Sequence, residues 1–122
     1  MQLTETYYAD QFPIEAYECG RLKMNGQFFE HSVIINTGQM PKQWHVQNTQ
    51  ELTRADLQLL LQDQPEVILL GTGAQLIFPA FELIHDISHQ GVGIEVMDTG
   101  AACRTYNLLL AEGRKVLAGL IL

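Results

Sequence analysis

The chain has 122 residues, 47% of them hydrophobic, and its fourteen acidic and seven basic residues give a net charge of −7 with the histidines neutral. This length and hydrophobic content fit one compact domain, so we expect residues 1–122 to fold as a single unit. The negative charge repels nucleic acid and anionic lipid, and no apolar run approaches the roughly 20 residues of a membrane-spanning helix. The sequence therefore argues against a nucleic-acid partner and against membrane insertion.

The start of the chain is polar and contains Glu5 and Asp10, whereas a secretory signal begins with basic residues and continues with an apolar run. The prediction that follows is a cytoplasmic location. In that compartment the two cysteines, Cys19 and Cys103, which lie far apart in the sequence, are expected to remain reduced.

Short extended runs and turn signals alternate in the first third of the chain. The runs Ile14–Cys19 and Phe28–Asn36 favour strands, and the Asn25-Gly26 pair between them is a strong hairpin signal. A further short strand is expected at Gln43–Val46. This part of the chain therefore predicts an antiparallel, β-rich unit.

Helical signals begin after residue 52. Thr53 is suited to cap a helix, with Asp56 as a partial capping box, and Pro65 ends it. One face of this helix carries the leucines at positions 57, 60 and 61.

Strands and helices alternate in the rest of the chain. The wholly apolar run Val67–Leu70 predicts a strand that is buried on both faces. It is followed by a predicted helix over 79–90, a strand over Val92–Met97, a helix over Thr99–Glu112 and a last strand over Lys115–Leu122. A right-handed crossover makes the strands at 67–70 and 92–97 parallel neighbours. The expected fold class is α/β, with the β-rich N-terminal part packed against it.

Two turns at the carboxyl ends of these parallel strands form the candidate ligand site, because such ends meet at one edge of a sheet. The candidate residues are Gly71, Thr72, Gly73, Asp98, Thr99, Arg104 and Asn107. Exposed backbone amides at helix starts attract anions, although the Asp98 carboxylate opposes this. A structural role is the simpler interpretation: glycine for a turn, Asp98 and Thr99 for a helix cap, and Arg104 and Asn107 for fixing the fold.

The segment His85-Asp86-Ile87-Ser88-His89 places two imidazoles one helical turn apart, as in zinc-binding helices. Helical spacing puts Phe81, Ile84, Ile87 and Ser88 on one side and Glu82, His85, Asp86 and His89 on the other. A solvated polar face is therefore expected, and no metal site.

Cys103 lies near the start of a predicted helix, where a thiolate is favoured and a nucleophile is conceivable. No basic partner and no hydrolase motif accompany it, so a packed thiol is expected. The sequence predicts no catalytic residues and no cofactor.

Several segments, in this order and spacing, resemble a family of unknown function that includes mitochondrial respiratory complex I assembly factor 3 and many uncharacterised bacterial proteins. The segments are Val67–Gly73, Gly93–Thr99, Ala102–Asn107 and Glu112–Arg114. The resemblance implies a compact three-layer α/β domain with a mixed central sheet and no accepted catalytic residues. It also implies a domain that acts by binding other proteins.

The functional prediction is accordingly a non-enzymatic interaction or assembly-type domain with an unidentified protein partner. The alternative is a small-molecule or anion-binding domain, or an enzyme, that uses the crevice at Gly71–Gly73 and Asp98–Asn107. A homodimer through an edge strand is a further prediction.

Overall fold

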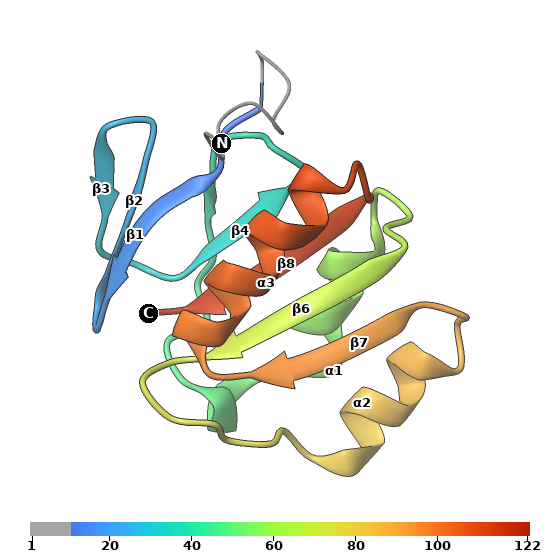
Figure 1. Ribbon diagram of the computed structural model, residues 1–122. Helices are drawn as coiled ribbons and strands as arrows, with labels where there is room; N and C mark the ends of the chain where they lie inside the picture. Colours follow the sequence, from blue (N-terminus) through green and yellow to red (C-terminus); the bar gives the residue numbers. More distant parts are fainter. Residues whose placement is uncertain (1–10) are drawn as a thin grey trace.

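The computed structural model describes residues 11–122 as two sheets and the helices that cover them (Figure 1). One sheet contains β1 (Ile14–Glu18), β2 (Arg21–Met24) and β3 (Gln27–Phe29). The other has the order β5-β4-β8-β6-β7, with β4 at Val33–Asn36, β5 at Lys42–Gln43, β6 at Val67–Thr72, β7 at Gly93–Met97 and β8 at Val116–Ile121. The helices are α1 (Arg54–Gln58), α2 (Phe81–Ser88) and α3 (Thr99–Ala111), and short 3-10 turns cover Thr49–Glu51 and Leu59–Leu61.

The five-stranded sheet is mixed. Strand β6 runs parallel to both β7 and β8, and β8 runs antiparallel to β4. The predicted parallel pairing of the strands around 67–70 and 92–97 is therefore confirmed, with Ile68 opposite Ile94 and Gly71 opposite Met97.

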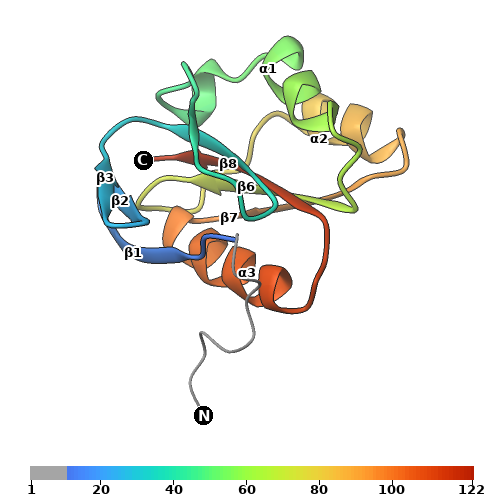
Figure 2. The same ribbon diagram turned by 90° about the horizontal axis from the view of Figure 1, so that it is seen from above.

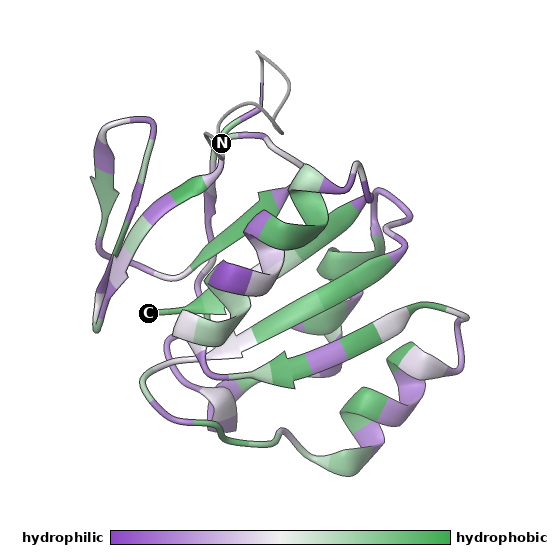
Figure 3. Ribbon diagram, viewed as in Figure 1, coloured by the Kyte–Doolittle hydropathy of each residue, from purple (hydrophilic) through white to green (hydrophobic). Residues whose placement is uncertain are grey.

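Three layers result, because α3 and the three-stranded sheet cover one face of the five-stranded sheet and α1 and α2 cover the other (Figure 2). The side chains of β6 alternate between the two faces of the sheet. Leu69 belongs to the core beneath α3, whereas Ile68 and Leu70 belong to the core beneath α1 and α2. A strand with both faces buried must be apolar throughout, and Figure 3 shows β6 and β8 as mostly hydrophobic ribbons. The expected α/β fold with a mixed central sheet and a β-rich N-terminal part is confirmed.

The N-terminal strands differ from the prediction. The run Phe28–Asn36 is not one strand, because it ends β3 in one sheet and resumes as β4 in the other. The Asn25-Gly26 hairpin is present but joins β3 to an additional strand, β2, and both turn residues have positive φ angles of 49° and 74°. The predicted strand at Gln43–Val46 is wrong beyond Gln43, since only Lys42 and Gln43 pair with β4.

Trp44 explains why the strand stops there. Its indole ring packs over Gly119 of β8, where an added Cβ would lie 2.9 Å from Cζ3 of the ring. The backbone N–H of Trp44 donates to the carbonyl of Ser32, at 2.8 Å. This large side chain therefore turns into the core beneath α1, and the chain leaves the sheet edge.

Thr53 and Asp56 form a complete capping box, where the sequence predicted a partial one. The Thr53 hydroxyl accepts from the Asp56 N–H at 3.2 Å, and the Thr53 N–H donates to the Asp56 carboxylate at 3.0 Å. Within residues 11–122, no helix has both the length and the hydropathy that a membrane span requires. The polar start of the chain, on which the cytoplasmic prediction depends, lies outside the described residues.

We expect Gly119→Ala to destabilise the fold by about 1 to 3 kcal/mol, because the new methyl group would overpack the Trp44 ring and the Leu60 side chain. Urea unfolding followed by tryptophan fluorescence measures this as a lower midpoint. Gly93→Ala in β7 is the control, since its methyl group would meet only a Val67 methyl at 3.9 Å. Equal losses in the two variants would contradict the packing argument.

Candidate functional site

The two glycine-bearing turns of the predicted crevice lie side by side. The N–H of Thr99 donates to the carbonyl of Gly73 at 2.9 Å, and the N–H of Gly73 donates to the Thr99 hydroxyl at 2.7 Å. The same hydroxyl donates to the carbonyl of Ile121 at 2.6 Å. Protein groups thus bind one another across the junction of β6, β8 and α3.

This junction is tightly filled. Thr72 and Thr99 are buried, and the Thr72 hydroxyl donates to the carbonyl of Gln75 and accepts from the N–H of Ile77. A Cβ at Gly71 would lie 2.8 Å from the Thr99 hydroxyl oxygen, so glycine is needed there for close approach. A ligand at Gly71–Gly73 would have to displace these hydrogen bonds.

The remaining candidates have separate positions. The Asp98 carboxylate accepts from the N–H of Ala101 at 2.9 Å, and Asp98 is the N-cap of α3. Thr99, the other predicted cap residue, is the first residue of the helix instead. The Asn107 side chain accepts from the N–H of Ile14 and donates to its carbonyl, both at 2.8 Å. Asn107 therefore attaches β1 to α3, while Arg104 lies exposed on the same helix. The ligand role of this whole set remains a prediction.

Arg104 and Asn107 also border a hollow of about 210 Å³ between β1 and α3, together with Tyr17, Gly100 and Cys103. Burial raises the pKa of the Cys103 thiol to about 12, with the nearby Asp98 carboxylate adding to the rise and Arg104 opposing it. The thiol is therefore neutral at physiological pH and packs as expected, rather than acting as a thiolate nucleophile.

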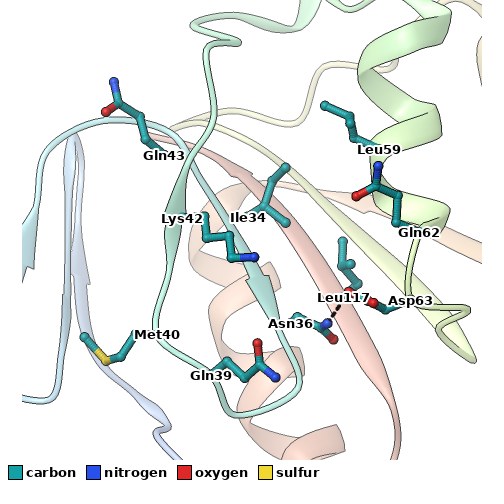
Figure 4. A pocket seen from close by; sticks show the side chains of 10 residues that line it. All are labelled: Ile34, Asn36, Gln39, Met40, Lys42, Gln43, Leu59, Gln62, Asp63 and Leu117. Atoms are coloured by element: carbon teal, nitrogen blue, oxygen red, sulfur yellow. Dashed lines mark hydrogen bonds between the residues drawn. The ribbon is translucent and has the colours of Figure 1, made fainter.

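A second hollow, of about 150 Å³, lies between β4, β5 and the 3-10 turn Leu59–Leu61 (Figure 4). Its apolar floor is Ile34 and Leu117, and the Lys42 amine points toward its centre. Its polar lining includes the amides of Asn36, Gln39, Gln43 and Gln62. Sequence reasoning missed this hollow, because these amides come from separate segments that share no motif.

A third feature is an apolar surface on the loop between β6 and α2. The side chains of Leu76, Phe78 and Phe81 are 51%, 70% and 73% exposed, and we call these three residues the 76–81 patch. The loop from 73 to 81 carries no charged residue. A groove of about 280 Å³ beside it is lined by apolar side chains that include Leu52, Ile77, Pro79 and Leu83.

The helical spacing predicted that Phe81 and Ser88 face the core, and this is wrong for both. Each is exposed, whereas Ile87 is buried in the core beneath α2 and Leu83 packs against it. Phe81 is the first residue of this short helix and precedes the residues that contact the core.

His85 and His89 are exposed, as the polar stripe predicted. The Phe81 ring stacks on His85 with centroids 5.4 Å apart, and the His89 ring meets His85 edge-on at 4.2 Å. Across residues 11–122, no cluster of three or more metal-ligating side chains includes them.

We expect Thr99→Val to cost about 2 to 4 kcal/mol of stability, because it preserves the shape but leaves the Gly73 N–H and the Ile121 carbonyl buried without a partner. Chemical unfolding at equilibrium measures the loss. Thr105→Val on the same helix is the control, since its hydroxyl makes only a 3.5 Å contact to the Met97 sulfur. A Thr99→Val midpoint equal to that of the control would contradict the proposed junction.

We expect iodoacetamide at about pH 8 to modify the exposed Cys19 and to leave Cys103 intact in the folded protein. The Cys103 thiol is buried and has a pKa of about 12, so almost none of it is the reactive thiolate at that pH. Peptide mass spectrometry measures the two sites, and urea should make Cys103 reactive. Rapid modification of Cys103 without denaturant would show that the thiol is accessible and ionised.

Solved structures share this fold over nearly the whole chain. A crystal structure of a Bordetella parapertussis protein has a TM-score of 0.85 and 35% identity, covering 93% of this chain and 97% of that one. A solution structure of a Bordetella pertussis protein, described as a Mth938-like domain, has a TM-score of 0.77 and 30% identity, covering 93% and 88%.

Relatives in sequence include the 13 kDa major membrane protein of Francisella tularensis, 35% identical over 101 residues, or 82% of each chain. They also include human NADH dehydrogenase (ubiquinone) 1 alpha subcomplex assembly factor 3, 28% identical over 99% of this chain but 66% of the assembly factor. The zebrafish assembly factor is 38% identical over 65% of this chain and 47% of its own length. The chain thus spans between about half and two thirds of these assembly factors. Residues 14–121 match one family over most of the chain, and the protein belongs to this family, described as "Protein of unknown function (DUF498/DUF598)".

Proposed function

We propose that this protein is a non-enzymatic interaction domain of the assembly-factor type, and that it binds a protein partner through the 76–81 patch. The observation that carries the proposal is the exposure of Leu76, Phe78 and Phe81 in the uncharged segment 73–81, which includes the first residue of α2. Relatives named as assembly factors for NADH dehydrogenase support the same class of function.

The energetics of the patch favour a partner. Burial of one large apolar side chain stabilises an interface by about 1.5 to 3 kcal/mol, and aromatic anchors dominate many interfaces. The patch offers two phenylalanines and a leucine, and the groove beside Pro79 and Leu83 provides a concave apolar surface for a partner side chain. Exposed large apolar side chains gathered in one short segment are typical of protein-binding surfaces.

The alternative, a ligand site in the crevice at Gly71–Gly73 and Asp98–Asn107, receives less support. The N–H of Gly73 and the hydroxyls of Thr72 and Thr99 already have protein partners. A ligand would replace these bonds rather than satisfy unused groups, so its net gain would be small.

We also propose a cytoplasmic location and a protein, rather than nucleic acid, as the partner, since the net charge of −7 repels polyanions. A homodimer stays a further prediction. Cell fractionation tests the location, and sedimentation tests the dimer.

We expect a photo-crosslinking amino acid at position 78 or 81 to give the same protein adduct in native cells, because both positions would contact one partner. Position 108 is the control: Leu108 is 60% exposed but lies on α3, on the opposite side of the five-stranded sheet (Figure 2). Mass spectrometry identifies the adducts.

A second arm tests the side chains themselves. Excess Phe78→Ser/Phe81→Ser protein should fail to compete for the adduct, whereas excess Leu108→Ser protein should compete as well as the unmodified chain. Circular dichroism confirms that each variant is folded. Absence of an adduct at 78 and 81, or the same adducts at 108, would refute the proposed surface.

A further inference from the structure

The hollow between β1 and α3 offers a binding site that lies apart from the 76–81 patch. Strand β1 is the outer strand of its sheet, and Asn107 holds it against α3 through both backbone groups of Ile14. Toward the start of α3 the two elements separate and leave the hollow of about 210 Å³. Its lining includes Tyr17, Gly100 and Arg104.

Arg104 supplies a positive charge there that forms no ion pair among the described residues. The other three arginines each pair with a carboxylate: Arg21 with Glu18, Arg54 with Asp86, and Arg114 with Glu66. In the range 11–122, no carboxylate lies within ion-pair distance of Arg104, although the chain carries twice as many acidic as basic residues. An unpaired guanidinium beside a hollow is a ready partner for an anion.

Tyr17 supplies a neutral donor. Its hydroxyl oxygen is shielded from solvent and has no hydrogen-bond partner among the described residues. Burial raises the pKa of Tyr17, and the nearby Cys19, Cys103 and Asp98 add to the rise, so the phenol stays protonated. A buried hydroxyl without a partner is costly, and an acceptor atom from a ligand would satisfy it.

Gly100 keeps the space between these groups open. A Cβ there would lie 3.6 Å from Nη1 of Arg104 and 3.6 Å from Cδ2 of Tyr17, both ordinary contact distances. No positive φ angle requires glycine at this position, and the tightest contact of an added Cβ would be the Asp98 carboxylate oxygen at 3.4 Å. The missing side chain leaves unfilled the space that a Cβ would occupy beside the guanidinium and the phenol ring.

The charges around the hollow select the kind of anion. The Glu15 carboxylate accepts from the N–H of Gly26, in the turn between β2 and β3, at 3.0 Å and so is already engaged. One Asp98 oxygen lies 3.4 Å from the position of the absent Gly100 Cβ, and this negative charge disfavours a phosphate dianion. A single carboxylate, with two oxygens that match the fork of a guanidinium, suits the site better.

We propose that this hollow binds a small carboxylate, with Arg104 as its charge partner and the Tyr17 hydroxyl as a second donor. The carboxylate belongs either to a free organic acid or to an acidic side chain of a peptide. This proposal is independent of the 76–81 patch, because the two surfaces lie on different elements.

The test is titration of ¹⁵N-labelled full-length protein with sodium acetate, followed by amide chemical shifts, with sodium chloride as the ionic-strength reference. We expect saturable shifts at residues of β1 and of the first turns of α3. Arg104→Gln should weaken acetate binding about tenfold or more, since it removes a charge-assisted contact. Tyr17→Phe should weaken binding less, and Gly100→Ala should weaken it by filling the space.

Arg114→Gln is the matched control, because it changes the net charge equally but removes an arginine that already pairs with Glu66 beyond the far end of α3. It should bind acetate as the unmodified protein does. A parallel titration with an acetylated, amidated glutamate peptide distinguishes a peptide side chain from a free acid by its tighter binding.

Three outcomes would overturn the proposal. They are the absence of saturable shifts with acetate and peptide alike, equal losses in Arg104→Gln and Arg114→Gln, and tighter binding of inorganic phosphate than of acetate. None of these depends on whether the 76–81 patch binds a partner.

Discussion

The hydroxyl group of Thr99 joins the three elements on which the central layer depends. It accepts a hydrogen bond from the end of β6 and donates one to the end of β8, while its own backbone begins α3. Gly71 permits this contact because it places no side chain between the strands and the helix. The direction in which α3 leaves the sheet is therefore set by one buried threonine.

The position of α3 in turn places the N-terminal part of the chain. Tyr106 accepts from the N–H of Gly38 at 2.6 Å, and Asn107 binds both backbone groups of Ile14. Two adjacent residues of one helix thus hold segments that lie far away in the sequence. The three-stranded sheet adds its own apolar contacts, with Leu22 and Met24 buried in the same core cluster as Tyr106.

The parts of the fold that the sequence predicts well are those whose signals are local. Strand β6 is an apolar run, α3 begins at a capping residue, and the parallel pairing follows from the handedness of one crossover. The division of 28–36 into two strands was not predictable in this way. It depends on the pairing of β4 with β8, more than eighty residues away.

The candidate site shows the same division. The parallel topology correctly predicts that the turns at 71–73 and 98–99 meet. It does not predict that the Thr99 hydroxyl fills the space between them, because sequence spacing does not determine a side-chain rotamer. Phe81 was assigned to the core since its spacing matches that of Ile84 and Ile87. Helical spacing does not indicate where the sheet beneath α2 ends. The exposed 76–81 patch could therefore not be predicted from it.

Glu95 lies in the middle of β7, the strand that ends the five-stranded sheet, and its side chain is exposed. Suppose that β7 of a second molecule paired antiparallel with this edge strand, with the twofold axis at the middle of the strand. The two Glu95 carboxylates would then lie directly opposite each other. Like charges directly across from each other weaken such pairing. Glu95 therefore disfavours both dimerisation through β7 and fibril formation by pairing at this edge strand.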